Sequence, residues 1–286
     1  MERRVVVIGR GKMGKALHVA ARARASGPWA LVRSSILKAP KRSKGVAMTW
    51  VLALRDAGIA DAAAALAPVV QRGDVVLHLA GMLGPEVLSA AKAAGARVAS
   101  MHPLCAVVEG NTRHVTLRGS AFAAEGDPEA VREAKRVARD VGGTLVEIRS
   151  VDRARYHGAA AMVATGGVAI AQAAEALFAA SSTPAPDEAA LRAMIASLLR
   201  SVASNVAVVG PRRALASPLM RDDTGTVSRH LDAMASQPEV RDLYRAAVAL
   251  VVETLDATKA VKPETVAEAR RLTRAAGERA ERPRSA

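Results

Sequence analysis

One glycine-rich turn near the amino terminus constrains the fold of this chain more than any other feature of its sequence. The motif G-x-G-x-x-G is formed by Gly9, Gly11 and Gly14, between the apolar run Val5–Ile8 and a helix-length segment. In such a strand–turn–helix unit, the first glycine permits a tight turn, the second lets the backbone approach a pyrophosphate, and the third lets the helix lie close to the strand. Helix N–H groups attract the same anion, so the turn predicts a dinucleotide-binding site. The other residues of the turn that we assign to this site are Arg10, Lys12 and Met13.

The segment after the second expected strand indicates which dinucleotide is bound. An NAD site places Asp or Glu about 20 residues after the glycines, where the carboxylate bonds the ribose 2′-hydroxyl, whereas an NADP site places a cation there. Residues 30–45 contain no acidic side chain. Arg33 stands at the expected end of the strand, and Ser34 and Ser35 follow it. We therefore predict NADP(H) as the cofactor; a solvated basic loop is the alternative interpretation of the same residues.

The rest of the chain falls into two parts. Short apolar runs alternate with helix-length segments as far as Ile148, which is typical of a largely parallel sheet flanked by helices, and only helices are expected after it. The predicted class is α/β: a Rossmann NADP-binding domain over residues 1–150, then an all-α substrate and dimerisation domain over residues 151–286. The expected strands are Val5–Ile8, Trp29–Arg33, Thr49–Leu54, Val75–Leu79, Arg97–Ser100, Val115–Leu117, Ala121–Ala124 and Thr144–Ile148. The expected helices are Met13–Ala25, Ile59–Ala67, Pro85–Ala94, Pro128–Val141, Asp152–Ala180, Asp187–Asn205, Thr226–Met234, Glu239–Thr258 and Pro263–Ala276.

Composition argues against several other classes of protein. A single cysteine, Cys105, rules out an intramolecular disulfide framework, and the amino-terminal apolar run is shorter than the roughly 7–15 residues of a signal-peptide core. We therefore expect a cytoplasmic protein.

The most apolar stretch, Gly158–Ala174, has fewer than ~18 uninterrupted apolar residues, so we expect a buried helix of a soluble protein and no membrane contact. The six histidines lack metal-binding spacing, and no metal site is proposed.

The formal net charge of +14 raises the possibility of a nucleic-acid partner. The arginines are scattered along the chain, and the few aromatic residues are not arranged as a platform for stacking bases. We therefore expect no nucleic-acid partner, and we interpret most of the charge as a solvated surface.

Several short motifs follow one another along the chain: GRGKMG, VLALRDAGI (51–59), HLAG (78–81), SMHPL (100–104), Tyr156-His157 and SPLMRDDTGTVSRHL (217–231). Their order resembles one family. Its members are predicted oxidoreductases with a Rossmann-like amino-terminal half and a helical domain of unknown function, and its relatives are pyrroline carboxylate reductase, ketopantoate reductase and prephenate dehydrogenase. The resemblance implies a helical domain that often dimerises, here through Gly158–Ala180, and an active site between the two domains. Ala80 stands where the family usually has Ser, and Thr165 stands where it tends to have Asn.

Hydride transfer to a carbonyl or imine needs a proton donor beside the nicotinamide. His157, early in the long helix, is our first choice, although a histidine at a helix start is often only structural. His102 precedes Pro103 and resembles the His-Pro loop of prephenate dehydrogenases; it could orient the substrate, bond the cofactor or simply bond the backbone. Tyr156 points about 100° away from its neighbour on a helix and could pack instead.

Three further groups complete the expected site. Leu54 and Arg55 follow a sheet strand and are expected beside the nicotinamide, and His78 near another strand end is assigned to the cofactor, unless strand alternation turns it into the sheet. Arg221 could hold a substrate carboxylate with Asp222 and the neighbouring Asp223 fixing it, or the aspartates could cap the next helix. Thr165 completes the predicted substrate site.

Three functions remain open from sequence alone. The favoured one is an NADP(H)-dependent reductase of a small carbonyl or imine compound, such as a keto acid of the ketopantoate type. The alternative is a non-catalytic NADP(H)-binding sensor or scaffold, which the departures at Ala80 and Thr165 motivate. A nucleic-acid-binding protein is the third, and it would bind DNA with a steep dependence on salt.

Overall fold

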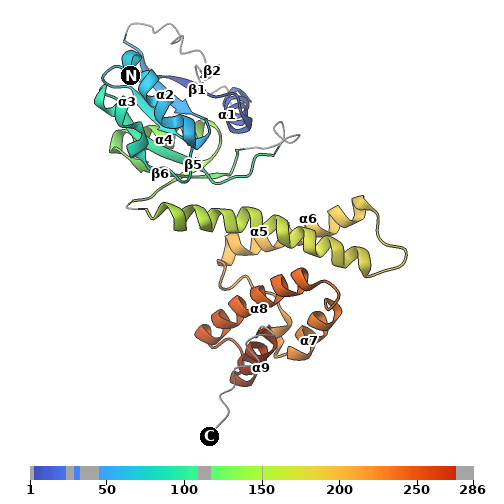
Figure 1. Cartoon of the computed structure of the whole chain (residues 1–286). Helices are drawn as coiled ribbons and strands as arrows, with labels where there is room; N and C mark the ends of the chain where they lie inside the picture. Colours follow the sequence, from blue (N-terminus) through green and yellow to red (C-terminus); the bar gives the residue numbers. More distant parts are fainter. Residues whose placement is uncertain (1–2, 24–28, 33–44, 109–116, 150, 275–286) are drawn as a thin grey trace. The chain divides into compact units, whose positions relative to one another are not determined.

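The computed structural model describes residues 3–23, 29–32, 45–108, 117–149 and 151–274. Its contacts divide the chain into two units, Met1–Thr165 and Gly166–Ala286. The first unit contains a seven-stranded sheet with helices, and the second is built from helices (Figure 1). One long helix, α5 (Arg153–Ala180), belongs to both units. The α/β class with a helical carboxyl-terminal part is therefore confirmed.

The sheet has the strand order β2-β1-β3-β4-β5-β6-β7. All neighbouring pairs are parallel except β5 and β6, which run antiparallel. The strands are β1 (Arg3–Ile8), β2 (Trp29–Val32), β3 (Ala47–Leu52), β4 (Val75–His78), β5 (Arg97–Pro103), β6 (Ala121–Gly126) and β7 (Thr144–Glu147).

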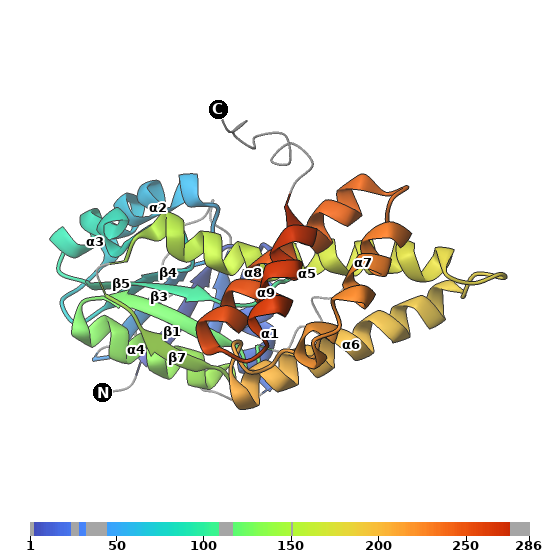
Figure 2. The same ribbon diagram turned by 90° about the horizontal axis from the view of Figure 1, so that it is seen from below.

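Helices cover the sheet on both faces, so its central strands β3 and β4 are buried throughout and mostly apolar rather than alternating. In β1, Val5 and Val7 face a core shared with α1 (Lys12–Ala23) and α4 (Pro128–Asp140). Its other residues, Val6 and Ile8, face a second core shared with α2 (Ile59–Leu66) and α3 (Ser89–Ala93). Figure 2 shows α2 and α3 above the sheet and α4 below it.

The strand order creates a crevice at one place on the sheet. From β1 the chain passes through α1 to β2 on one side, and its next strand, β3, lies on the other side of β1. The loops that leave β1 and β3 therefore diverge at their carboxyl ends, which is where open α/β sheets bind ligands. The backbone N–H of Ala53 donates to the carbonyl of Ile8 at 2.8 Å and keeps the two strand ends together at this point.

The helical unit has its own small core. Leu219, Val227, Leu231, Val252, Leu255, Val266 and Ala269 bury their side chains against one another. Aspartate and proline residues mark several helix starts, because Asp accepts from free N–H groups and Pro lacks one. The helices are α6 (Glu188–Val209), α7 (Thr224–Ala233), α8 (Pro238–Thr258) and α9 (Pro263–Thr273), with a short 3-10 turn at Pro218–Arg221.

Most of the expected strands differ from the observed ones by a few residues at one end or both, and two of these differences bear on the site. The fifth strand extends to Pro103, because β6 pairs with it antiparallel and His102 lies opposite Ala123. His102 is therefore a strand residue and not a loop residue. The third strand begins at Ala47 and ends at Leu52, so Leu54 lies in the loop that follows. The expected strand Val115–Leu117 lies mostly outside the described residues, as does the end of the first helix.

The burial expected for Gly158–Ala174 is not found. No residue of α5 is buried in the single chain, and Val163 is 80% exposed. Together with α6, this helix is long and apolar enough to cross a membrane by length and composition alone, which is weak evidence for a span. The expectation was wrong because it took apolar composition as a sign of burial within one chain, whereas composition does not say what covers a helix.

Candidate functional site

The glycine turn has the close contacts that its motif requires. Gly9 has φ +117°, and a Cβ on it would lie 2.2 Å from the carbonyl oxygen of Ala53. A Cβ on Gly14 would lie 2.0 Å from the carbonyl oxygen of Gly9, so α1 can approach the strand only with glycine there. A Cβ on Gly11 would meet nothing within 4 Å. Gly9 and Gly14 thus serve close packing, while Gly11 borders open space.

This open space belongs to a pocket at the carboxyl ends of β1, β3 and β4, which we name the turn pocket. Its volume is about 690 Å³. The wall comes from the loops after β1, β3 and β4, from the end of β5 and from His157 on α5, and it combines backbone, basic and apolar groups with one carboxyl group, that of Asp56. The lining residues are Gly11–Met13, Ala53–Asp56, Leu79–Met82, His102, Pro103, Cys105 and His157.

A second pocket of about 590 Å³, the apolar pocket, adjoins it. Most of its wall is Ala, Val, Leu and Pro, from the end of β5 and from one side of α5. It shares His102, Pro103, Cys105 and His157 with the turn pocket, so the two histidines lie where the pockets meet. The other lining residues are Leu104, Ala106, Ala160, Ala161, Val163, Ala164 and Thr165.

The two histidines and Tyr156 form one cluster. The Tyr156 hydroxyl lies 2.9 Å from Nδ1 of His102, with the rings 5.7 Å apart at 76°. The ring of His157 lies 5.9 Å from that of His102. A Cβ on Gly81 would lie 2.6 Å from Cδ2 of His157 and 2.9 Å from Nε2 of His102, so only glycine lets both rings approach this turn.

Burial sets the protonation of this cluster. It lowers the pKa of His102 below its ordinary value of 6.5, and the charges of His157 and Arg153 lower it further. It also raises the pKa of Tyr156 above 10. At neutral pH, His102 is therefore a neutral imidazole and Tyr156 a protonated phenol.

An arginine fixes the helix that carries Tyr156 and His157. Arg153 donates to the Ser100 hydroxyl at 3.2 Å and pairs with the carboxylate of Glu125, which ties the start of α5 to β5 and β6. Arg153, Tyr156 and His157 are spaced i, i+3 and i+4, so they share one side of the helix. Sequence reasoning missed Arg153 and the role of Tyr156, although this spacing was a signal for both.

The expected cofactor contact of His78 is corrected by the structure. Its side chain is fully buried, with Nε2 donating to the carbonyl of Gly84 at 3.1 Å and Nδ1 accepting from the N–H of Ala80 at 3.3 Å. Burial lowers its pKa to about 4, so the ring is neutral. His78 shapes the turn that lines the turn pocket, and it does not face that pocket.

The charged group expected to hold a substrate carboxylate belongs to the second unit, and its aspartates have structural partners. Asp222 accepts from the hydroxyl of Thr265 at 2.6 Å, and Asp223 accepts from the N–H of Thr226 at 2.9 Å as the cap of α7. The alternative interpretation as a cap of the next helix therefore holds for Asp223, whereas Asp222 bonds Lys262 and Thr265 at the start of α9. Arg221 ends the 3-10 turn just before them.

The structure brings together most of the remaining predicted residues. Gly11, Lys12, Met13, Leu54 and Arg55 line the turn pocket, and Thr165 lines the apolar pocket with the two histidines. Gly9, Arg10 and Gly14 form the turn itself. Arg33, Ser34 and Ser35 lie outside the described residues, so the choice of NADP over NAD stays a prediction. Within the described ranges, no group of three or more His, Cys, Asp or Glu side chains is placed to hold a metal ion.

A glycine turn after the first strand, set beside a pocket at the switch point of a parallel sheet, defines a Rossmann dinucleotide-binding fold. The turn fits such a ligand, because Gly11, the one of its three glycines with open space around the Cβ position, also borders the pocket. The basic residues Lys12 and Arg55 lie in the same wall, where a pyrophosphate needs positive charge.

Comparisons with known proteins agree with this fold. Residues 120–251 match the model of a domain of unknown function, DUF2520. Protein TM1727 from Thermotoga maritima is 22% identical, with a TM-score of 0.62 over 89% of this chain and 99% of that one. The predicted NADP oxidoreductase BF3122 from Bacteroides fragilis is 18% identical, with a TM-score of 0.62 over 87% and 98%.

Pyrroline carboxylate reductase from Plasmodium falciparum, solved with NADP bound, is 12% identical, with a TM-score of 0.54 over 95% of this chain and 98% of that one. No curated protein matches the sequence. At these identities the similarity establishes the shared fold. The expected likeness to pyrroline carboxylate reductase is thus confirmed at the level of fold, whereas a likeness to ketopantoate reductase stays a prediction.

Proposed function

We propose that this chain is an NADP(H)-dependent oxidoreductase that reduces a small carbonyl or imine compound. The observation that carries the proposal is the place of His102 and His157, where the pocket beside the glycine turn meets the apolar pocket. When bound, NADP(H) would supply the hydride. The chain would bind the cofactor at the glycine turn and the substrate against the apolar pocket. A histidine at the junction of the two pockets would give the substrate a proton.

The glycine turn would hold the pyrophosphate through backbone N–H groups at the start of α1, with Lys12 and Arg55 adding positive charge. Arg33, Ser34 and Ser35 are our candidates for the 2′-phosphate, because no carboxylate is available in that segment to bond a free ribose hydroxyl.

The apolar pocket supports a substrate with an apolar substituent. Alanines 160, 161 and 164 of α5 form one side of its wall, and the imidazoles lie at the end shared with the turn pocket. A carbonyl or imine beside the imidazoles would leave its carbon substituent against this wall. A keto acid of the ketopantoate type would also need a cation for its carboxylate, and Arg221 of the second unit is our candidate.

Calorimetry on the intact protein tests cofactor binding. We expect NADPH to bind and Gly11→Asp to weaken it at least about tenfold, since a carboxylate would enter the space where the pyrophosphate is expected. Gly58→Asp is the matched control, because its Cβ also meets nothing within 4 Å and it does not line the turn pocket.

The outcomes of this test separate the competing functions. No heat with any nicotinamide dinucleotide, oxidised or reduced, would contradict the proposal as a whole. Equal affinity for NADH and NADPH would contradict the choice of NADP. Binding of NADPH without turnover of a broad panel of carbonyl and imine compounds would instead favour the non-catalytic sensor.

A further inference from the structure

The contact between Tyr156 and His102 assigns roles that the histidines alone leave open. We propose that Tyr156 is a positioning residue that keeps the proton of neutral His102 on Nε2, and that His102 is thereby the proton donor of the site. The chemistry of this inference rests on the proposed reductase function, but its geometry does not.

The two ring nitrogens of His102 have different surroundings. Nδ1 lies 2.9 Å from the Tyr156 hydroxyl, so it is the nitrogen that α5 controls. Nε2 lies on the side of Gly81, which lines the turn pocket. Among the described residues, His157 has a ring contact with His102 but no hydrogen bond that would fix its own tautomer. Of the two histidines, His102 is the one that the protein holds in place.

Charge decides which partner donates in this contact. The guanidinium of Arg153 acts on Tyr156 and on His102, and in both cases it lowers the pKa. When a phenol donates a hydrogen bond, negative charge grows on its oxygen, and a nearby cation favours that. The same cation disfavours an imidazolium. The favoured arrangement therefore has the hydroxyl donating to Nδ1, which leaves the ring proton on Nε2.

This arrangement allows a proton to move in two linked steps. As the substrate carbon gains a hydride, its oxygen gains the electron pair of the C=O π bond and takes the Nε2 proton of His102. Nδ1 takes the hydroxyl proton of Tyr156, so the imidazole stays neutral and a phenolate forms near Arg153. Water then returns a proton to Nε2, and the Nδ1 proton returns to the phenolate. A neutral imidazole serves as the electrophile in other enzymes as well.

Nitrogen NMR of the full-length, ¹⁵N-labelled protein tests the tautomer directly. We expect the wild-type His102 to carry its proton on Nε2, with its signals assigned by their loss in His102→Gln. In Tyr156→Phe the Nδ1-protonated form should become substantially populated. A wild-type ring protonated on Nδ1 would overturn the proposal, and this measurement needs no cofactor.

A second histidine–tyrosine pair supplies the matched control. His230 Nδ1 lies 2.8 Å from the Tyr244 hydroxyl, with the rings 5.7 Å apart at 74°, in the helical unit. Tyr244→Phe removes the same kind of bond at a place that lines neither pocket. It should change the signals of His230 and leave the tautomer of His102 and the NADPH-dependent rate as they are.

Kinetics then separate positioning from folding. Tyr156→Phe should lower the rate of NADPH consumption about 100- to 1,000-fold, within the range of general acid catalysis, and change NADPH affinity less than about twofold. An unchanged rate with an unchanged tautomer would overturn the role of Tyr156. Failure of NADPH to bind the wild-type protein would overturn the proposed function instead, and the tautomer would still decide what Tyr156 does.

Discussion

At the scale of single residues, the glycine turn was the most predictable part of the site. Gly14 meets the backbone of Gly9 within the turn itself, and Gly9 meets the backbone of Ala53 just after the neighbouring strand, so the motif indicates both close contacts. His78 and Tyr156 were less predictable. The side chain of His78 points into the sheet packing, and only the paired strands fix that. Tyr156 does diverge from His157, but His102 comes from a distant strand and contacts both rings.

The buried ring of His78 makes stability depend on pH. Its pKa is about 4 in the folded protein against an ordinary 6.5. Between these values the unfolded chain binds a proton at His78 that the folded chain does not, so stability is lost as the pH falls. Urea unfolding should show a contribution from His78 of about 2 kcal/mol lost between pH ~7 and pH ~5.

The variant His78→Gln isolates this contribution. It should be less stable than the wild type near pH ~7, where the backbone partners of the ring lose a bond, and its stability should fall less towards pH ~5. If the free energy of unfolding of the variant fell with pH as steeply as that of the wild type, groups other than His78 would be responsible for the pH dependence. His18 and His102 also have lowered pKa values and account for the slope that remains.

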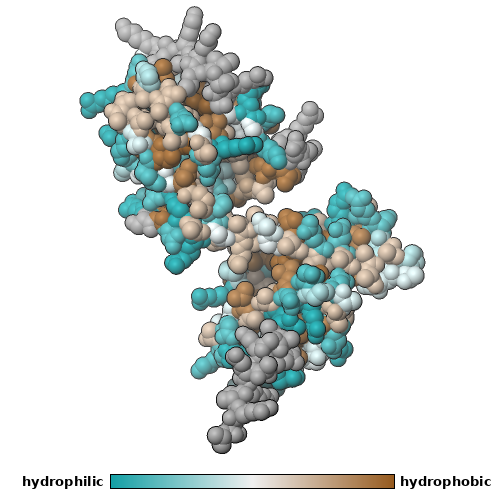
Figure 3. All heavy atoms as spheres, viewed as in Figure 1, coloured by the Kyte–Doolittle hydropathy of each residue, from teal (hydrophilic) through white to brown (hydrophobic). Residues whose placement is uncertain are grey.

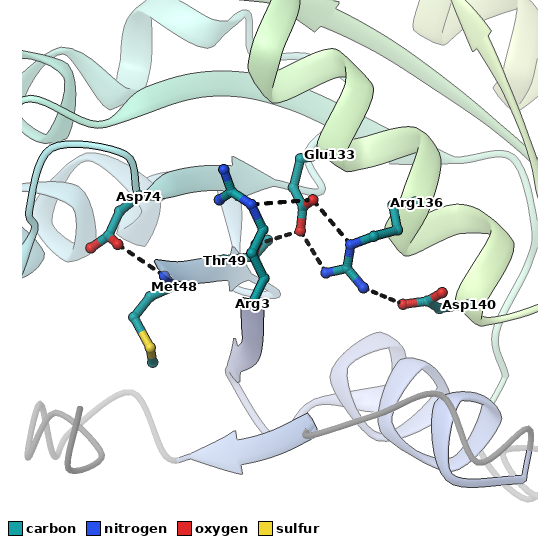
Figure 4. Close-up of polar contacts among 7 residues, drawn as sticks. All are labelled: Arg3, Met48, Thr49, Asp74, Glu133, Arg136 and Asp140. Carbon is teal, nitrogen blue, oxygen red and sulfur yellow. Dashed lines mark hydrogen bonds and ion pairs between the residues drawn. The ribbon is translucent and has the colours of Figure 1, made fainter. Parts of the chain in front are cut away.

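At the scale of elements, one carboxylate joins α4 to the sheet (Figure 4). Glu133 is 7% exposed and accepts from Nη2 of Arg136 at 2.6 Å and from the hydroxyl of Thr49 on β3. Nε of Arg3, at the start of β1, lies 3.8 Å from it. Arg136 in turn bonds Asp140 at 2.7 Å. The group therefore links α4 with β1 and β3 towards the amino ends of these strands, whereas the glycine turn lies at their carboxyl ends.

Removal of this carboxylate should destabilise the first unit strongly. Glu133→Ala leaves the charge of Arg136 and the buried hydroxyl of Thr49 without their main acceptor, and we expect a loss of about 3–5 kcal/mol in urea unfolding. Glu129→Ala on the same helix is the control, because its pair with Arg97 is half exposed and should cost less than ~1 kcal/mol. Equal losses in the two variants would contradict a special role for Glu133.

The bounds of a helix or strand were predictable where residues of the segment itself mark its ends. They were less predictable where pairing with a distant strand sets the end. The helix α4 begins at Pro128 after Asp127, as its sequence indicates. The extension of β5 through His102 was not predictable, because it depends on an antiparallel neighbour that comes later in the chain. The register of that pairing places His102 within the sheet, which local sequence patterns do not encode.

At the scale of the whole molecule, the exposed apolar side chains of α5 and α6 support our proposal of a homodimer. Figure 3 shows apolar side chains at the surface over these helices. On α6, Leu198, Val202, Val206 and Val209 recur every three or four residues and form one stripe, with Leu198 56% and Val202 55% exposed. Such a stripe is stable in water when it is covered, and a second copy presents the same stripe.

Light scattering tests this expectation at low micromolar concentration. The wild type should have twice the 29.7 kDa mass of one chain, and the double variant Leu198→Lys, Val202→Lys should have the mass of one chain. Ser204→Lys adds one positive charge on the opposite side of α6 and should remain dimeric. A monomeric wild type that instead associates with phosphatidylcholine vesicles would contradict the dimer and favour a membrane surface.

The division between the two units falls at a particular point of α5. Gly166 follows Thr165 at the boundary, and Gly167 comes next, so two adjacent glycines interrupt a run of good helix formers. A Cβ at either position would meet nothing within 4 Å, and close packing therefore does not explain them. Since glycine weakens a helix and paired small residues are common sites of kinks, the rod is most easily bent there. Because Thr165 lines the apolar pocket, this weak point of the helix lies directly at the end of that pocket.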